Sequence, residues 1–79
     1  MMKKNEHGLT YYRDNIRHLV CIPYSIDNLH RMADDLGIGR HFFHKNHYDI
    51  PAKRVNDPRI IENSTLIRPR EILQIVKSL

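Results

Sequence analysis

The chain has 79 residues, which predicts one domain spanning residues 1–79 with a thin hydrophobic core. Its single cysteine excludes an internal disulfide and favours a reducing, cytoplasmic setting, and no apolar run approaches the roughly 20 residues that span a bilayer. The net charge of +4 favours anionic partners such as nucleic acid or nucleotides. We therefore expect no membrane partner, and a homodimer is compatible with so small a core.

The first half of the chain predicts a strand followed by a helix. Residues 17–22, RHLVCI, contain four consecutive apolar residues and end before Pro23, which is typical of a buried strand. Ser25 is a suitable N-cap for a helix that reaches Leu36, and Gly37 is a suitable residue to end it. The side chains expected to form the buried stripe of this helix are Ile26, Leu29, Met32, Ala33 and Leu36.

The second half predicts shorter elements. Residues 39–45 suit either a short helix or an ordered turn, and residues 46–50 suit a strand. Residues 51–62 are expected to be helical in two short pieces, and residues 65–67 to form a short strand. A last helix is expected to open at Pro69. Its buried stripe would be Ile72, Ile75, Val76 and Leu79.

This alternation of strands and helices predicts a small α/β domain with a parallel or mixed sheet. We expect three strands, or four if Leu9–Tyr12 adds an edge strand, and three to four short helices. Residues 1–8 are polar and are expected to form a flexible arm. A mostly helical domain, in which residues 46–50 and 64–67 are loops, is the alternative.

Three of the six histidines, His41, His44 and His47, follow one another at intervals of three residues. On a helix this spacing spreads the rings over about 120° of the circumference, which is too wide for all three to bind one ion. We therefore expect no cofactor, with zinc as the alternative that stays open if only some of these histidines bind it. If an ion does bind, the ligands expected are His47, Asp49 and His18.

Residues 32–43, MADDLGIGRHFF, also suit the bend of a helix-turn-helix. Against this interpretation, polar Asn46 and His47 stand where the second helix would need an apolar residue. In such a fold, the side chains facing the major groove would be Arg40, His41, His44, Lys45 and Asn46.

Acid–base chemistry is a further interpretation of the histidines. If residues 17–22 and 46–50 pair in parallel, His18 and His47 begin adjacent strands and could face one cleft. His30 lies at the edge of the first helix's apolar stripe and could reach the same rim. Asp49 shares a strand face with His47 and could orient its ring.

The sequence also resembles a small bacterial and phage family of unknown function, number 4031 in the domain-of-unknown-function series. The resemblance covers roughly residues 17–77. The residues that carry it are His18-Leu19-Val20, Leu29-His30, Ala33, Leu36-Gly37, Phe43, His47-Tyr48-Asp49-Ile50-Pro51 and Arg70-Glu71-Ile72-Leu73.

This resemblance implies that one set of residues belongs together, and it leaves His41 and His44 outside that set. The set is His18, His30, His47, Tyr48 and Asp49. The chain departs from the family where LTYYRDN replaces an apolar strand containing an acidic residue, and where NDPRIIEN replaces an Ala- and Gly-rich segment. The family brings no established activity.

Our first hypothesis is a domain that binds nucleic acid or another phosphate-bearing ligand without catalysis. Its charge would come from Arg40, Lys45, Lys53 and Arg54, and its pocket would be shaped by His18, His30, His47 and Tyr48. The alternative is a phosphodiester or nucleotide hydrolase, with or without metal, in which His18, His30, His47 and Asp49 are catalytic. A small protein-interaction module is a third hypothesis, and it would present an exposed apolar patch.

Overall fold

The computed structural model describes residues 8–78. Leu79 and nearly all of the flexible arm expected over residues 1–8 lie outside this range. No helix of the described residues is long and apolar enough to cross a membrane.

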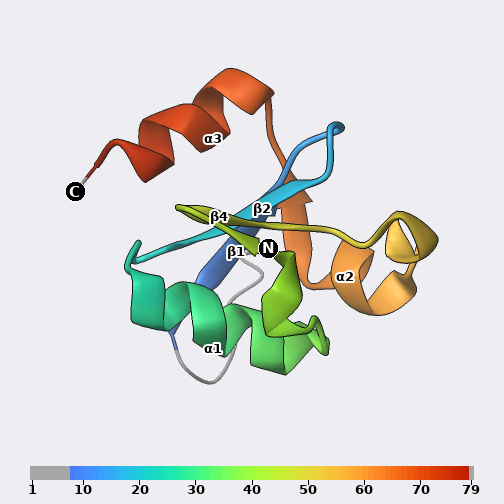
Figure 1. Cartoon of the computed structure of the whole chain (residues 1–79). Helices are drawn as coiled ribbons and strands as arrows, with labels where there is room; N and C mark the ends of the chain where they lie inside the picture. Colours follow the sequence, from blue (N-terminus) through green and yellow to red (C-terminus); the bar gives the residue numbers. More distant parts are fainter. Residues whose placement is uncertain (1–7, 79) are drawn as a thin grey trace.

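The centre of the fold is a mixed sheet of five strands in the order β3-β4-β2-β1-β5 (Figure 1). Only β1 and β5 pair in parallel, and the other neighbours are antiparallel. The strands are β1 (Thr10–Arg13), β2 (His18–Ile22), β3 (Phe43–His44), β4 (His47–Asp49) and β5 (Ser64–Leu66). The predicted α/β class with a mixed sheet is confirmed, and the expected number of strands was too low.

The described residues also form three α-helices and two 3-10 turns, of which the last helix follows the last strand and the others lie between strands. They are α1 (Ile26–Leu36), η1 (Arg40–Phe42), η2 (Ala52–Arg54), α2 (Pro58–Glu62) and α3 (Pro69–Val76). Helix α1 covers one face of the sheet and α3 crosses the other, while α2 lies beside β5 (Figure 1). The sheet therefore has one layer of side chains on each face. The neighbours of a strand residue depend on the face toward which its side chain points.

Strand β1 corrects the edge strand expected at Leu9–Tyr12, because β1 lies inside the sheet between β2 and β5. Tyr11 is 1% exposed, and its hydroxyl donates to the Asp35 carboxylate of α1 at 2.9 Å. The buried Tyr11 side chain thus anchors β1 in the core. One edge of β1 pairs with β2, and the other edge pairs with β5, where Arg13 lies beside Leu66.

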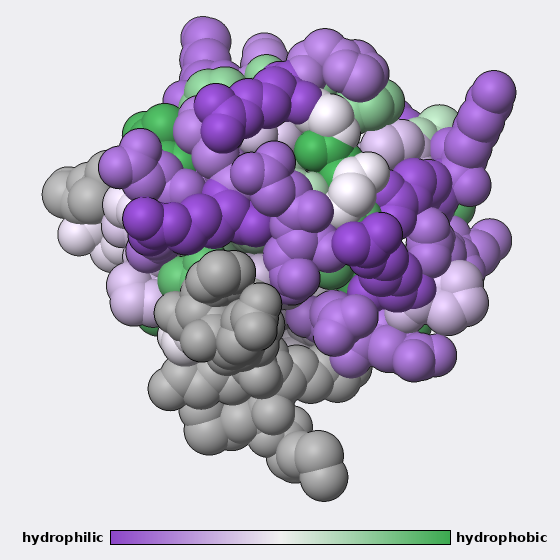
Figure 2. All heavy atoms as spheres, turned by 90° about the horizontal axis from the view of Figure 1, so that it is seen from below, coloured by the Kyte–Doolittle hydropathy of each residue, from purple (hydrophilic) through white to green (hydrophobic). Residues whose placement is uncertain are grey.

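Helix α1 begins and ends as the sequence predicts. The Ser25 hydroxyl accepts a hydrogen bond from the Asn28 N–H at 3.0 Å, and Gly37 has a φ of 69°, a left-handed conformation that favours glycine. The predicted stripe is buried except for Ile26, which is 40% exposed because it lies in the first turn. Figure 2 views the molecule from the α1 side, where hydrophilic side chains cover most of the described surface.

The segment from Gly39 to Asp49 forms a 3-10 turn and a hairpin, and it contains no recognition helix. After η1, the chain pairs β3 with β4 and reverses through Lys45, whose φ is 56°. The helix-turn-helix interpretation is therefore wrong. The prediction of two helical pieces over residues 51–62 is confirmed by η2 and α2.

Candidate metal centre

His18, His47 and Asp49 meet on the α3 face of the sheet. β2 and β4 pair so that His18 lies opposite Asp49, and His47 is two residues away on the same face. One ligand atom from each of the three lies within 4.8 Å of the others. The ligand set expected from the sequence is thus brought together, although the strands pair antiparallel and the parallel pairing expected for them was wrong.

The cluster is half-buried and open on one side. The two imidazole rings meet edge to face with their centroids 4.9 Å apart. The exposed fractions of the side chains are 34% for His18, 17% for His47 and 48% for Asp49. A site of this kind is shielded enough to strengthen electrostatic interactions and open enough for a ligand to enter.

Asp14, which is not among the predicted site residues, holds the His18 ring in place. Its side chain is fully buried, and Oδ2 accepts a hydrogen bond from Nδ1–H of His18 at 2.7 Å. Oδ1 accepts from the backbone N–H groups of Ile16 and His18, each at 2.9 Å. Because the proton of His18 is held at Nδ1, the lone pair of Nε2 is left for a ligand. The only signal in the sequence was an acid in the turn four residues before His18.

His47 faces an oxygen at each of its two ring nitrogens. Nδ1 lies 2.9 Å from Oδ1 of Asn46, and Nε2 lies 3.2 Å from Oδ1 of Asp49. Burial lowers the pKa of His47 against the opposing effect of Asp49, and the neighbouring His18 and His44 lower it further. A neutral ring has one N–H and satisfies only one of these oxygens. A cation between Nε2 and Asp49 would satisfy the other.

Two imidazoles and one carboxylate are a ligand set used by zinc and by non-haem iron in catalytic sites that keep open positions. The carboxylate–histidine pair made by Asp14 is the usual arrangement behind a metal-bound imidazole. These residues fit a divalent transition metal.

His30 and Tyr48 lie on the other face of the sheet, which corrects their place in the predicted site. Tyr48 points toward α1, is 0% exposed, and shares a 2.6 Å hydrogen bond with Nδ1 of His30. The His30 ring also contacts the ring of Phe43, with centroids 5.0 Å apart. Because side chains alternate along β4, Tyr48 and His47 point to opposite faces of the sheet. The single cleft expected for His18, His30 and His47 is therefore wrong for His30.

The predicted basic residues divide into two groups. Arg54 is held inside the structure, where it donates to the carbonyl oxygens of Leu36 and Gly37 and to Asp57, each at 2.7 Å. It closes the C-terminal end of α1 and is not available to a ligand. The other three are exposed side chains on separate turns: Arg40, Lys45 and Lys53.

His41 and His44 are both exposed, and neither belongs to the cluster of ligand atoms. The His41 ring contacts Phe42, with centroids 4.2 Å apart. His44 pairs with His47 across the hairpin, and its ring centroid lies 5.5 Å from that of His47. Of the three evenly spaced histidines, His47 thus belongs to the cluster, His44 lies beside it and His41 lies outside it.

Comparison with known proteins places the whole fold in one family. Searches of curated proteins and of solved structures found no match. Residues 6–78 match the family model described as "Protein of unknown function (DUF4031)". The match covers nearly all of the sequence, including every residue of the cluster and Asp14, and the chain belongs to this family.

Proposed function

We propose that this domain is a metal-dependent hydrolase of phosphoesters. The observation that carries the proposal is the convergence of His18, His47 and Asp49 within 4.8 Å, with Asp14 orienting the first ring. These three residues would hold one divalent ion. The remaining coordination positions would take a water molecule and a phosphate oxygen.

The charges around the cluster support a cation and argue against a bare phosphate site. Asp14 and Asp49 contribute two carboxylates, and burial lowers the pKa of His47 so that its neutral form is favoured. An anionic phosphate beside these groups would be repelled. A divalent ion would cancel the two negative charges, and the overall charge of +4 would then attract anionic substrates.

The chemistry needs only water as a co-reactant. A divalent ion held by His18, His47 and Asp49 would supply positive charge beside the phosphate and would lower the pKa of a bound water to about 7. The water would lose a proton to solvent, its oxygen would bond to phosphorus, and the bond from phosphorus to the leaving oxygen would break. That oxygen keeps the electron pair and takes a proton from solvent.

Phosphate or nucleic-acid binding without chemistry was the first hypothesis from the sequence, and the structure supports it less. Tyr48 is buried and Arg54 caps a helix, so two of its named binding residues are unavailable. Arg40, Lys45 and Lys53 are exposed and would contribute attraction at long range.

Metal titration followed by a hydrolysis assay tests the proposal. Zn²⁺, Mn²⁺ and Co²⁺ would be titrated into chelator-treated protein by calorimetry. Hydrolysis of bis(p-nitrophenyl) phosphate would then be measured with each ion and with the chelator. We expect one ion per chain and hydrolysis that the chelator abolishes.

Asp49→Asn is the informative variant, because Asp49 is half-exposed and its amide keeps the same size. We expect it to weaken metal binding by about 100-fold or more. His41→Asn is the matched control, since it removes an exposed imidazole outside the cluster. Weaker binding in His41→Asn with no loss in Asp49→Asn would point to nonspecific binding by surface histidines and would overturn the proposed site. A tightly bound ion without hydrolysis would overturn the enzymatic part.

A further inference from the structure

A pocket of about 280 Å³ adjoins the metal site between the sheet and α3. One wall carries His18, His47 and Asn46, and the opposite wall is apolar. The apolar wall is formed by Pro69, Ile72, Leu73 and Val76 of α3. The cluster therefore opens into a space that is polar on the sheet side and apolar on the helix side.

The apolar wall exposes hydrophobic side-chain surface that does not pack against the sheet. Of the described residues of α3 only Ile72 is fully buried, whereas Leu73 is 52% exposed. Leu73, which lines the same pocket as the two imidazoles, leaves about half of its surface in water in the free protein. It gains contacts when an apolar group enters the pocket.

We infer that the substrate carries a compact ring with an apolar face, such as the nucleobase that a sugar joins to the phosphate in a nucleoside phosphate. This inference rests on the proposed metal-dependent hydrolysis and names its substrate class. A phosphate on the ion would place its neighbouring group against Leu73 and Ile72. The volume lies just below the range of about 300–1,000 Å³ typical of small-ligand pockets, so it suits one ring and not a duplex. A free nucleotide and the terminal nucleotide of a single strand both present this chemistry.

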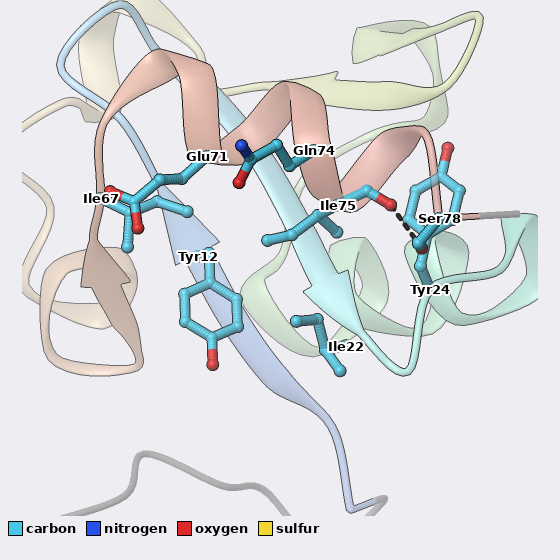
Figure 3. Close-up of a pocket in the computed structure, with 8 residues that line it drawn as sticks. All are labelled: Tyr12, Ile22, Tyr24, Ile67, Glu71, Gln74, Ile75 and Ser78. Atoms are coloured by element: carbon cyan, nitrogen blue, oxygen red, sulfur yellow. Dashed lines mark hydrogen bonds between the residues drawn. The ribbon is translucent and has the colours of Figure 1, made fainter.

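A larger pocket of about 500 Å³ lies on the other side of α3, between that helix and the strands β1 and β2 (Figure 3). Tyr12, Ile22 and Ile75 point into it, and neither imidazole of the cluster lines it. Helix α3 lies between this pocket and the metal site. A phosphate on the ion could not place its attached group in this larger pocket. A substitution there therefore serves as a control for a substitution in the pocket beside the metal site.

Hydrolysis of matched phosphoesters tests the inference. Phenyl phosphate, adenosine monophosphate, glycerol phosphate and a short single-stranded oligonucleotide with a terminal phosphate would be compared at saturating Zn²⁺. We expect KM for the phenyl and adenosine esters to be about tenfold lower than KM for glycerol phosphate. The oligonucleotide distinguishes a strand terminus from a free nucleotide as the source of the group.

Leu73→Ala should remove most of this preference while metal affinity, measured separately by calorimetry, stays unchanged. Ile22→Ala, which trims a 44% exposed side chain of the larger pocket, should leave KM unchanged. Hydrolysis with equal KM for all esters would overturn this inference and leave the metal-dependent function standing. Absence of both metal binding and hydrolysis would overturn the two together.

Discussion

The buried carboxylate of Asp14 accepts a hydrogen bond from Nδ1–H of His18 at 2.7 Å, and the same carboxylate accepts the backbone N–H of His18. The pair joins the turn before β2 to the first side chain of that strand. It fixes the direction in which the ring points and the nitrogen that carries the proton. The availability of Nε2 on His18 therefore depends on a residue that never touches the ligand.

Asp14→Asn should weaken metal binding by about 10- to 100-fold with the fold intact. The amide oxygen can keep the two backbone hydrogen bonds, which turns the amide N–H₂ toward Nδ1 of His18. The ring then accepts at Nδ1 and carries its proton on Nε2, where the metal would bind. Nitrogen-15 NMR of the imidazole rings in the metal-free protein would report this change of tautomer.

Asp34→Asn is the control for this variant, because Asp34 is an exposed carboxylate on α1 far along the chain from the site. It removes the same charge and should alter neither the tautomer nor the metal affinity. If Asp14→Asn keeps the proton of His18 on Nδ1, the orienting role of Asp14 is wrong.

Tyr48→Phe should destabilise the fold by about 1 kcal/mol and leave metal binding unchanged. The variant removes the 2.6 Å hydrogen bond to His30 but keeps the buried ring, and both residues lie on the α1 face of the sheet. Urea denaturation gives the free energy of unfolding. Tyr12→Phe is the comparison, since the described residues offer the Tyr12 hydroxyl no hydrogen-bond partner; a larger effect there would contradict the prediction.

Arg54→Ala should lower the free energy of unfolding by about 2 kcal/mol, because it leaves the last carbonyl oxygens of α1 without their donors. Lys53→Ala removes the same charge from an exposed neighbour and should be close to neutral. Thermal unfolding of both variants makes the comparison. Equal stability of the two would show that the contacts of Arg54 at the helix end contribute little.

Cys21 should not react with a thiol reagent at pH 8 while the protein is folded. Burial raises the pKa of this thiol from 9.0 to about 12, so the thiolate is nearly absent at that pH. The pKa of Cys21 is higher in the folded state than in the unfolded chain. The contribution of the neutral thiol to the free energy of unfolding is therefore fully present below about pH 9 and is lost as the pH rises toward 12. Labelling with and without urea measures accessibility, and rapid labelling of the folded protein would contradict the prediction.

The parts of the fold that could be predicted from the sequence are those with local signals. The four apolar residues before Pro23 marked β2, and Ser25 and Gly37 marked the two ends of α1. The alternation through His47, Tyr48 and Asp49 also correctly put His47 and Asp49 on one face. In each case the residues that decide the structure are neighbours along the chain.

The place of strand β1 inside the sheet and the direction of strand pairing could not be predicted in this way. The segment of Tyr11 and Tyr12 has too little apolar alternation to stand out, and it is buried because β2 and β5 pair with it on both sides. Strand direction depends on how the connections cross the sheet, and no single stretch of residues encodes that.

By itself the sequence predicted no cofactor, and it named His18, His47 and Asp49 as the ligands only for the case that an ion binds. Only the tertiary structure decided that these three converge, that His30 and Tyr48 do not, and that Asp14 supports them. The reason is that a sheet sorts side chains by face: residues adjacent in sequence, such as His47 and Tyr48, are separated by the backbone, while antiparallel pairing brings His18 opposite Asp49 from 31 positions away along the chain.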